Sequence, residues 1–271
     1  MAQDSDLQDV SANDVNELFG AFRKELDARY DLHEKVVKIS RDVTIESKRL
    51  IFLLHRIDFT AEKLENSLQQ AKEKHLFILE KLKKVAVLLK DVDTFQFVRA
   101  FSAGLQEFIE ATAFMFFIEK CNEVNCENIC SIILSMHQVT DFLSFSDETD
   151  SSKTVRLEFP VEEYLLGIAD VTGEMMRLCI NSSASSLGQK DLSKSLSFKL
   201  TAYVQALHNA FSIFVHIVDV SQGLRKHFDE KLRTMTANVK KCEDVCYTLR
   251  LRGHEMPHDI LKATLMEATE K

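Results

Sequence analysis

The sequence predicts an all-α protein, and three observations support this prediction. Only seven of the 271 residues are Gly and only two are Pro, both well below their usual share. Long segments repeat apolar residues every three or four positions, the spacing of one face of a helix. The connections between these segments are short. So few chain-breaking residues over this length favour one bundle of long helices.

A polar, acidic stretch without periodicity opens the chain. We therefore expect a disordered tail over residues 1–13, followed by a single helical domain over residues 14–271. The first helix is expected at about residues 13–57, where Gly20 is the one Gly and Pro is absent. A helix of about 40 residues is about 60 Å long, at 1.5 Å rise per residue. That length favours an elongated bundle or an assembly surface.

The polar side of this first helix is basic. It carries five cationic residues: Lys38, Arg41, Lys48, Arg49 and Arg56. One interpretation is an ordinary solvent-exposed face. The other is a stripe that follows a nucleic-acid backbone, with Arg41 and Lys48 as candidate phosphate contacts.

The second and third helices are expected at about residues 60–90 and 94–121. The second repeats apolar residues at alternating spacings of four and three, like a coiled-coil seam. His75 falls on that seam, where we expect a hydrogen-bonded core residue rather than a ligand. Residues 91–93 offer an acidic cap for the third helix. Residues 111–118 are apolar on all sides, which is typical of a central helix.

The remaining elements follow from local patterns. A shorter helix is expected at 126–144, and a polar, acidic loop at about 144–153 is the main internal break. Residues 155–159 alternate apolar and polar side chains, which predicts an extended segment. Pro160 then begins a helix at its favoured first position. Further helices are expected at these ranges: 161–183, 193–220, 224–252 and a short 257–269.

Two pairs of carboxylates stand out because they lie in apolar helices. Glu107 and Glu110 are three residues apart, and Asp170 and Glu174 are four apart on a narrow polar stripe. Each pair therefore shares one helix face. Buried carboxylates are costly unless they are paired, protonated or bound to a metal. If the two helices pack side by side, the four acids converge.

Two chemistries remain open for such a cluster. All-oxygen donors suit Mg²⁺, Mn²⁺ or Ca²⁺, and such sites activate water for attack at phosphorus. Alternatively, the acids form ordinary ion pairs with Arg99, Lys120 or Arg177. A di-iron centre is excluded because it needs Glu-x-x-His partners, and neither helix contains a His.

Composition and motifs exclude several other classes. The net charge is −8, from 34 basic and 42 acidic residues, which argues against a stand-alone nucleic-acid binder but not against a catalytic subunit with a basic partner. No phosphate-binding Gly-rich loop, HExxH or GxSxG motif occurs. The six Cys form no CxxC pair, so we expect reduced structural thiols. No apolar run is long enough for a membrane span, and the acidic start is not a secretory signal.

Four segments together resemble the factor X branch of the translin family. They are SRDVTIESKR at 40–49, GLQEFIEA at 104–111, EYLLGIADVTGEMMR at 163–177 and CYTLRLRG at 246–253. The similarity runs from about residue 19 to residue 262. It implies an elongated seven-helix bundle of the translin type that assembles with translin into a hollow hetero-octamer.

The resemblance also implies an activity. Factor X is the Mg²⁺-dependent endoribonuclease of that complex, with Mn²⁺ as an alternative ion, and translin supplies most nucleic-acid binding. The complex cleaves single-stranded RNA, including the nicked passenger strand of small interfering RNA, and so promotes activation of the silencing complex. Processing of transfer-RNA precursors and binding of single-stranded DNA are further expectations. A non-catalytic scaffold that binds translin, or a purely structural bundle, remains the alternative.

The family's metal-binding and catalytic acids match Glu107, Glu110, Asp170 and Glu174. All four positions are acidic here, which favours factor X over translin. The candidate RNA phosphate contacts are these four residues: Arg41, Lys48, Arg99 and Arg177. Some family members carry a basic import segment before the first helix, where this chain is acidic. We therefore expect a cytoplasmic protein, with the nucleus as a second location.

Overall fold

The structure is a computed structural model that describes residues 12–57, 61–124, 126–146, 154–183, 195–219 and 221–252. Seven α-helices make up most of it: α1 (Ala12–His55), α2 (Ala61–Leu88), α3 (Val98–Lys120), α4 (Met136–Phe142), α5 (Val161–Ser182), α6 (Leu196–Ile217) and α7 (Gln222–Arg252). The prediction of an all-α bundle with seven helices is confirmed. The smaller elements are the 3₁₀ helices η1 (Thr94–Phe97) and η2 (Cys126–Ile132) and the strands β1 (Ser144–Ser146) and β2 (Thr154–Arg156).

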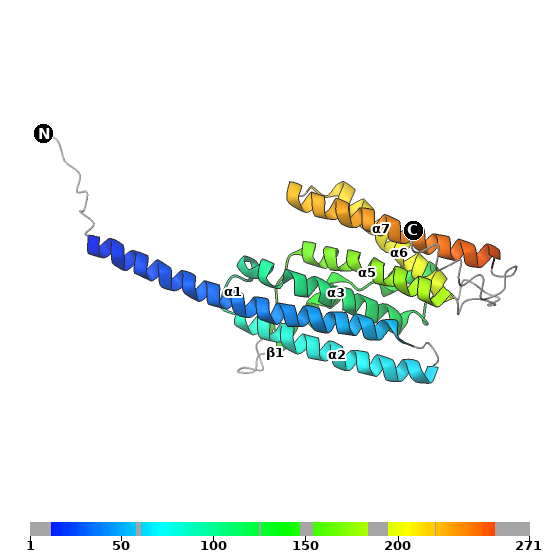
Figure 1. Cartoon of the computed structure of the whole chain (residues 1–271), viewed down its shortest axis with the longest axis horizontal. Helices are drawn as coiled ribbons and strands as arrows, with labels where there is room; N and C mark the ends of the chain where they lie inside the picture. Colours follow the sequence, from blue (N-terminus) through cyan, green and yellow to red (C-terminus); the bar gives the residue numbers. More distant parts are fainter. Residues whose placement is uncertain are drawn as a thin grey trace.

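Four of the long helices run in the same direction and lie side by side (Figure 1). Cross-helix contacts fix this order: Lys48 of α1 pairs with Glu107 of α3, and Gln106 of α3 bonds to Glu163 of α5. Lys231 of α7 in turn pairs with Asp170 of α5. The helices α2 and α6 run in the opposite direction, and α2 lies on the outer side of α1 (Figure 1). The result is an elongated body in which α1, α3, α5 and α7 share one polarity.

Helix α3 is the centre of this body. Thirteen of its residues are buried, and it packs against α1, α2 and α5. This explains why the sequence is apolar on all sides over residues 111–118. The helical stretch Thr94–Lys120 has the length and composition of a membrane span, and 67% of its most apolar window is buried inside the body.

A glycine allows α1 and α3 to approach closely. A Cβ on Gly104 would lie 2.6 Å from the backbone oxygen of Ser40, closer than real side chains come. The Gly104 amide also donates a hydrogen bond to the Ser40 hydroxyl, at 3.2 Å. This contact lies one turn before Glu107 on α3. It therefore fixes how α1 passes the first acid pair.

A second glycine does the same between α3 and α5. A Cβ on Gly167 would lie 2.9 Å from the Cβ of Ile109. Gly167 precedes Asp170 by three residues, as Gly104 precedes Glu107. Both close contacts therefore lie one turn before a carboxylate pair, and they hold three helices together beside the acids.

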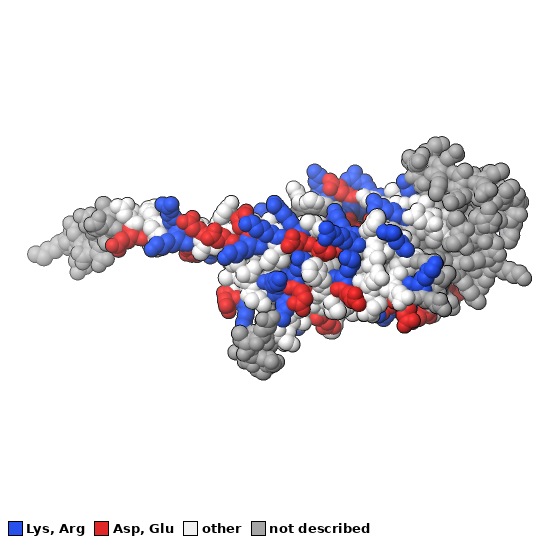
Figure 2. All heavy atoms as spheres, turned by 60° about the horizontal axis from the view of Figure 1, so that its bottom comes forward, with Lys and Arg blue, Asp and Glu red and all other residues white. Residues whose placement is uncertain are grey.

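The first part of α1 projects beyond the body (Figure 1). Large apolar side chains on it are exposed: Val15, Leu18, Phe19, Phe22, Leu26 and Tyr30. Charged side chains of both signs alternate along it (Figure 2). The helix is 44 residues long, in agreement with the prediction, and every residue from 15 to 31 is exposed.

The region between α3 and α5 differs from the prediction. One helix was expected at 126–144, but the chain forms η2, the short α4 and β1. Ser135 explains the interruption, because its hydroxyl accepts from the Gln138 amide at 3.2 Å while the Gln138 side chain accepts from the Ser135 amide at 2.8 Å. This capping box begins a new helix. The strand β2 pairs with β1, in agreement with the extended segment expected near residue 155.

Three local predictions can be checked directly. Asp93 accepts from the Phe95 amide at 3.1 Å, but it caps η1 and not the third helix, because α3 begins only at Val98. Helix α5 begins at Val161, as the range 161–183 predicts, with Pro160 as its N-cap and not its first residue. All six Cys are free thiols, in agreement with the prediction. Gly253, the predicted helix at 257–269 and residues 1–11 of the predicted tail lie outside the described residues.

His75 provides the first testable prediction. Its Nε2 lies 3.0 Å from the Thr112 hydroxyl in the core, and burial lowers its pKa from 6.5 to about 4. The unfolded chain therefore binds a proton at this histidine more readily between these pH values, and the contribution of His75 to the free energy of unfolding should fall as the pH drops from 6.5 to 4. The loss is on the order of 3 kcal/mol, at about 1.4 kcal/mol per pKa unit.

Chemical denaturation across this pH range tests the prediction. His75→Gln should remove the fall in unfolding free energy. His137→Gln is the matched control, because His137 is exposed on α4. An unchanged pH profile in His75→Gln would contradict a neutral buried histidine.

Candidate functional site

The four predicted carboxylates meet on one side of the α3–α5 contact. Glu107 and Glu110 come from α3, and Asp170 and Glu174 come from α5; we call these residues the acid cluster. Burial raises the pKa of Glu110 to about 8, and the charges of Asp170, Glu107 and Glu174 raise it further. Each of the other three acids therefore acts on Glu110. The convergence expected from the sequence is present.

Lysines from two further helices reach the acid cluster. The Lys48 ammonium of α1 lies 3.0 Å from Glu107 Oε1, and this contact raises the pKa of Lys48. The Lys231 ammonium of α7 pairs with Asp170. The site is therefore built by four parallel helices, of which two supply acids and two supply cations.

Glu174 is held by two basic groups. His55, in the last turn of α1, places its Nε2 2.6 Å from one carboxylate oxygen, and Arg177 places a guanidinium nitrogen 2.7 Å from the other. Burial alone would raise the pKa of Glu174, but His55 and Arg177 outweigh burial and hold it below its usual value. Glu174 therefore stays ionised at neutral pH.

One ring nitrogen of His55 is buried without a hydrogen bond from the described residues. Its Nδ1 is buried and has no hydrogen-bond partner within the described part of the chain. The ring packs against Phe114, with ring centroids 4.9 Å apart. Since Nε2 faces a carboxylate, it carries the proton in the neutral ring, and the Nδ1 lone pair is unsatisfied.

Glu110 differs from the other three acids. Among the described residues it makes neither a hydrogen bond nor an ion pair, and Lys231 lowers its pKa only in part. With a pKa near 8, its carboxyl is mostly protonated at neutral pH. Three ionised acids therefore pair with three cations, and the fourth acid, Glu110, carries a proton instead.

The candidate cations fall into two groups. Lys48 and Arg177 lie at the acid cluster, where they bond Glu107 and Glu174. Arg41 and Arg99 are exposed and make no contact with the acid cluster in the described structure. Of the three ion-pair partners expected from sequence, only Arg177 bonds an acid of this cluster. Lys120 instead lies 4.2 Å over the ring of Phe116.

Two site residues were missed by sequence reasoning. His55 ends the apolar run that follows the SRDVTIESKR motif, and Lys231 is one of many basic residues on α7. No spacing rule joins either residue to the acids, because both reach them from other helices. Helix α1 does supply a His to the acid cluster, although α3 and α5 contain none. It is a single His that belongs to no Glu-x-x-His motif, so a di-iron centre is still excluded.

The donors of the acid cluster fit a hard divalent cation in their chemistry but not in their spacing. All four are carboxylates, the ligands that Mg²⁺ and Mn²⁺ prefer, and the pKa of Glu110 is raised first by burial and then by the charges of the other three acids. Among the described residues, no three His, Cys, Asp or Glu side chains are spaced to hold one ion. Glu107 and Asp170 bond lysines instead, so an ion would have to replace the two ammonium groups there.

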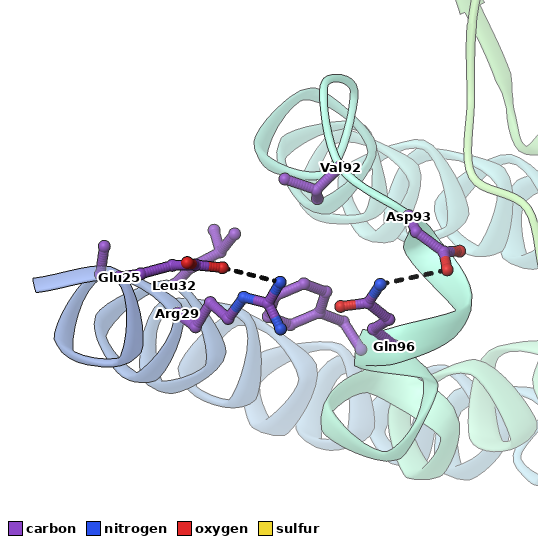
Figure 3. A pocket seen from close by; sticks show the side chains of 8 residues that line it. Glu25, Arg29, Leu32, Val92, Asp93 and Gln96 are labelled. Carbon is purple, nitrogen blue, oxygen red and sulfur yellow. Dashed lines mark hydrogen bonds and ion pairs between the residues drawn. The ribbon is translucent and has the colours of Figure 1, made fainter. Parts of the chain in front are cut away.

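A cavity of about 330 Å³ lies elsewhere, where α1 leaves the body (Figure 3). It lies between α1 and the segment that begins η1, and Arg29 at its mouth pairs with Glu25 at 3.1 Å. None of its lining residues belongs to the acid cluster or bonds it. It is therefore not part of the candidate site.

Comparisons with known proteins agree with this arrangement. The chain matches the model of the Translin family over residues 31–253. It is 36% identical to translin-associated protein X of Mus musculus over 258 residues, which are 90% of this chain and 81% of the relative. It is 23% identical to translin of Homo sapiens, over 88% of this chain and 94% of that one.

Two solved structures share the fold. The crystal structure of apo-NeC3PO aligns with a TM-score of 0.55 and 18% identity, over 84% of this chain and 94% of the other. The structure of an AfC3PO–duplex RNA complex aligns with a TM-score of 0.54 and 17% identity, over 88% and 99% of the two chains. At these identities the likeness concerns the fold alone.

Proposed function

Because the chain belongs to the translin family, we propose that it is the metal-dependent endoribonuclease subunit of a hetero-oligomer with translin, acting on single-stranded RNA. The observation that carries this proposal is the convergence of four acids from two helices, one of which, Glu110, keeps its proton. The translin-associated protein X relatives support translin as the partner.

The acid cluster is the proposed metal centre. Glu107, Glu110, Asp170 and Glu174 would hold Mg²⁺ or Mn²⁺, which supplies Lewis-acid stabilisation of the phosphate and an activated water. His55 and Arg177 fix both oxygens of Glu174, so that carboxylate is oriented before any ligand arrives.

The basic side chains at the rim have a second role in this proposal. Lys48 is 63% exposed and Lys231 is 30% exposed at the side chain, so both can turn from a carboxylate toward an incoming phosphate. Arg177 is 64% exposed and presents its remaining donors to solvent. Cations in these positions attract RNA to an acidic site and balance charge on the phosphate.

Glu110 supplies a proton-transfer group. Its pKa of about 8 lies near neutral pH, where a carboxyl can both accept and release a proton. Release of that proton when the cation binds would leave a fourth ligand oxygen. The proposal therefore gives this one residue a metal-binding and a proton-transfer role.

A non-catalytic scaffold is the second candidate function. It is favoured by one observation: three of the four acids are already bonded to basic residues. In that case the acid cluster would tie α1, α3, α5 and α7 together by ion pairs. Translin binding would then occur without RNA cleavage.

Metal dependence tests the two candidates. The chain is co-expressed with translin, and cleavage of a single-stranded RNA is measured with Mg²⁺, with Mn²⁺ and with excess EDTA. We expect cleavage with either ion and none with EDTA, and we expect Glu107→Ala to abolish it. Assembly without cleavage under any of these conditions would favour the scaffold.

The thermal midpoint of the same complex gives a second readout that needs no RNA. Divalent cation should raise it, because a ligand that binds only the folded state stabilises that state. The rise should be absent in Glu107→Ala. An equal rise in wild type and variant would place the ion elsewhere.

A further inference from the structure

One exposed aromatic residue borders the acid cluster. Phe52 of α1 is 65% exposed, although its helix neighbours Ile51 and Leu54 are buried in the core. The guanidinium of Arg56 lies 5.7 Å from the centroid of its ring. Phe52 and Arg56, which we call the aromatic platform, therefore present a flat ring and a planar cation to solvent.

The platform is connected to the site through α1. Phe52 follows Lys48 by four residues and precedes His55 by three, the spacings at which side chains share a helix face. Lys48 bonds Glu107 and His55 bonds Glu174. Phe52 is therefore one helical turn from two residues that touch the acid cluster.

The surroundings of Phe52 are cationic. Lys48, Arg49 and Arg56 are exposed around it, and basic side chains gather over the body on the face shown in Figure 2. The exposed apolar residue before it on this side of α1 is Ile45, two turns away. A ring among cations fits a nucleic acid better than a protein surface, which would offer a continuous apolar patch.

We propose that the aromatic platform stacks a nucleobase of the single-stranded RNA whose phosphate enters the acid cluster. This inference rests on the proposed function and adds a binding site for a base of the RNA. Every base has a π face, so stacking on Phe52 tolerates any sequence, and Arg56 adds a cation–π contact. The platform therefore positions RNA without selecting among bases.

Binding experiments test the proposal in the complex with translin. The complex carries Glu107→Ala so that the RNA stays intact, and its Kd is measured at one salt concentration. Phe52→Ala should weaken binding of a single-stranded RNA about fivefold or more. For an oligonucleotide of equal length with abasic nucleotides, the same substitution should change Kd little, because no base is left to stack.

The chain offers a matched control. Phe77 of α2 is 52% exposed and lies 4.8 Å from the Lys81 ammonium, which is a similar aromatic–cation pair. Neither Phe77 nor Lys81 contacts the acid cluster in the described structure. Phe77→Ala should leave RNA binding unchanged, and Phe52→Tyr, which keeps a ring, should bind like wild type.

Fluorescence gives an independent readout. The chain has no Trp, so Phe52→Trp introduces one at the platform. Single-stranded RNA should quench its emission, whereas the abasic oligonucleotide should not. The complex without the substitution serves as the blank, because any Trp emission that it shows comes from translin.

Three outcomes separate the possibilities. Equal Kd values for wild type and Phe52→Ala would overturn the stacking site while leaving the nuclease proposal intact. A loss that is equal for normal and abasic RNA, or failure to assemble with translin, would also overturn it and indicate a protein contact. Base-dependent binding and quenching by a complex that never cleaves RNA would support the stacking site and contradict the nuclease.

Discussion

Replacement of Glu110 by Gln is expected to abolish RNA cleavage and to stabilise the fold at the same time. Loss of a direct metal ligand should lower the cleavage rate by more than about 100-fold, the upper range found for residues that only orient ligands. Glutamine has the same shape but cannot ionise. The loss would therefore reflect missing charge rather than altered packing.

The stability change follows from the raised pKa. The folded state keeps a proton on Glu110 up to about pH 8, whereas an ordinary Glu loses it near 4.5. The folded state thus binds the additional proton between these values, and the contribution of Glu110 to the free energy of unfolding of the wild type falls as the pH rises through them. Glu110→Gln lacks that fall, so its stability relative to wild type should increase from pH 4.5 to pH 8.

Cleavage assays and denaturation curves on one preparation test both parts. Glu163→Gln is the matched control: Glu163 is partly buried on α5 and accepts a hydrogen bond from Gln106 at 2.6 Å, but it is outside the acid cluster. It should retain cleavage. A Glu110→Gln variant that cleaves at the wild-type rate would show that the cluster's fourth carboxylate is dispensable.

Gly104→Ala is expected to destabilise the bundle by about 2 kcal/mol. The new methyl would meet the backbone oxygen of Ser40 at 2.6 Å, and a backbone atom cannot rotate away. Overpacking typically costs about 1–3 kcal/mol, partly offset by up to about 1 kcal/mol because Ala favours the helix. The helices α1 and α3 would have to separate, which moves Lys48 and His55 from the acids.

Thermal unfolding measures this effect, and Gly173→Ala provides the control. Gly173 lies inside α5, where an added Cβ would only touch Asn238 at an ordinary 3.9 Å. That substitution should be neutral or stabilising. A loss of about 2 kcal/mol corresponds to a thermal midpoint about 4–8 °C lower for a chain of this size. Equal midpoints for the two variants would show that the α1–α3 contact at Gly104 tolerates a side chain.

Much of the fold follows from local rules. The long helices could be predicted because apolar periodicity and the rarity of Gly and Pro act within each segment. Helix η2 and the short α4 were missed, although Ser135 and Gln138 have the spacing of a capping box. The capping box is a local signal for a helix start at Ser135, whereas the apolar periodicity of the same segment predicts one continuous helix.

The four acids and one of their partners, Arg177, could be singled out from the sequence, but the partners that come from other helices could not. Glu107 and Glu110 stand out because carboxylates at helical spacing are unusual in an apolar segment. His55 and Lys231 reach them only because α1 and α7 pass α3 and α5 at a particular register. That register depends on close contacts such as the one at Gly167, and these are tertiary features that spacing along one helix does not encode.

The most direct test of the account is the position of the metal ion in the complex with translin. Crystals grown with Mn²⁺ would give an anomalous difference map at the manganese absorption edge. The account predicts a peak between α3 and α5 bounded by Glu107, Glu110, Asp170 and Glu174, with the ammonium groups of Lys48 and Lys231 turned away. A complex that cleaves RNA in Mn²⁺, but has no peak there and keeps both lysines bonded to Glu107 and Asp170, would contradict it.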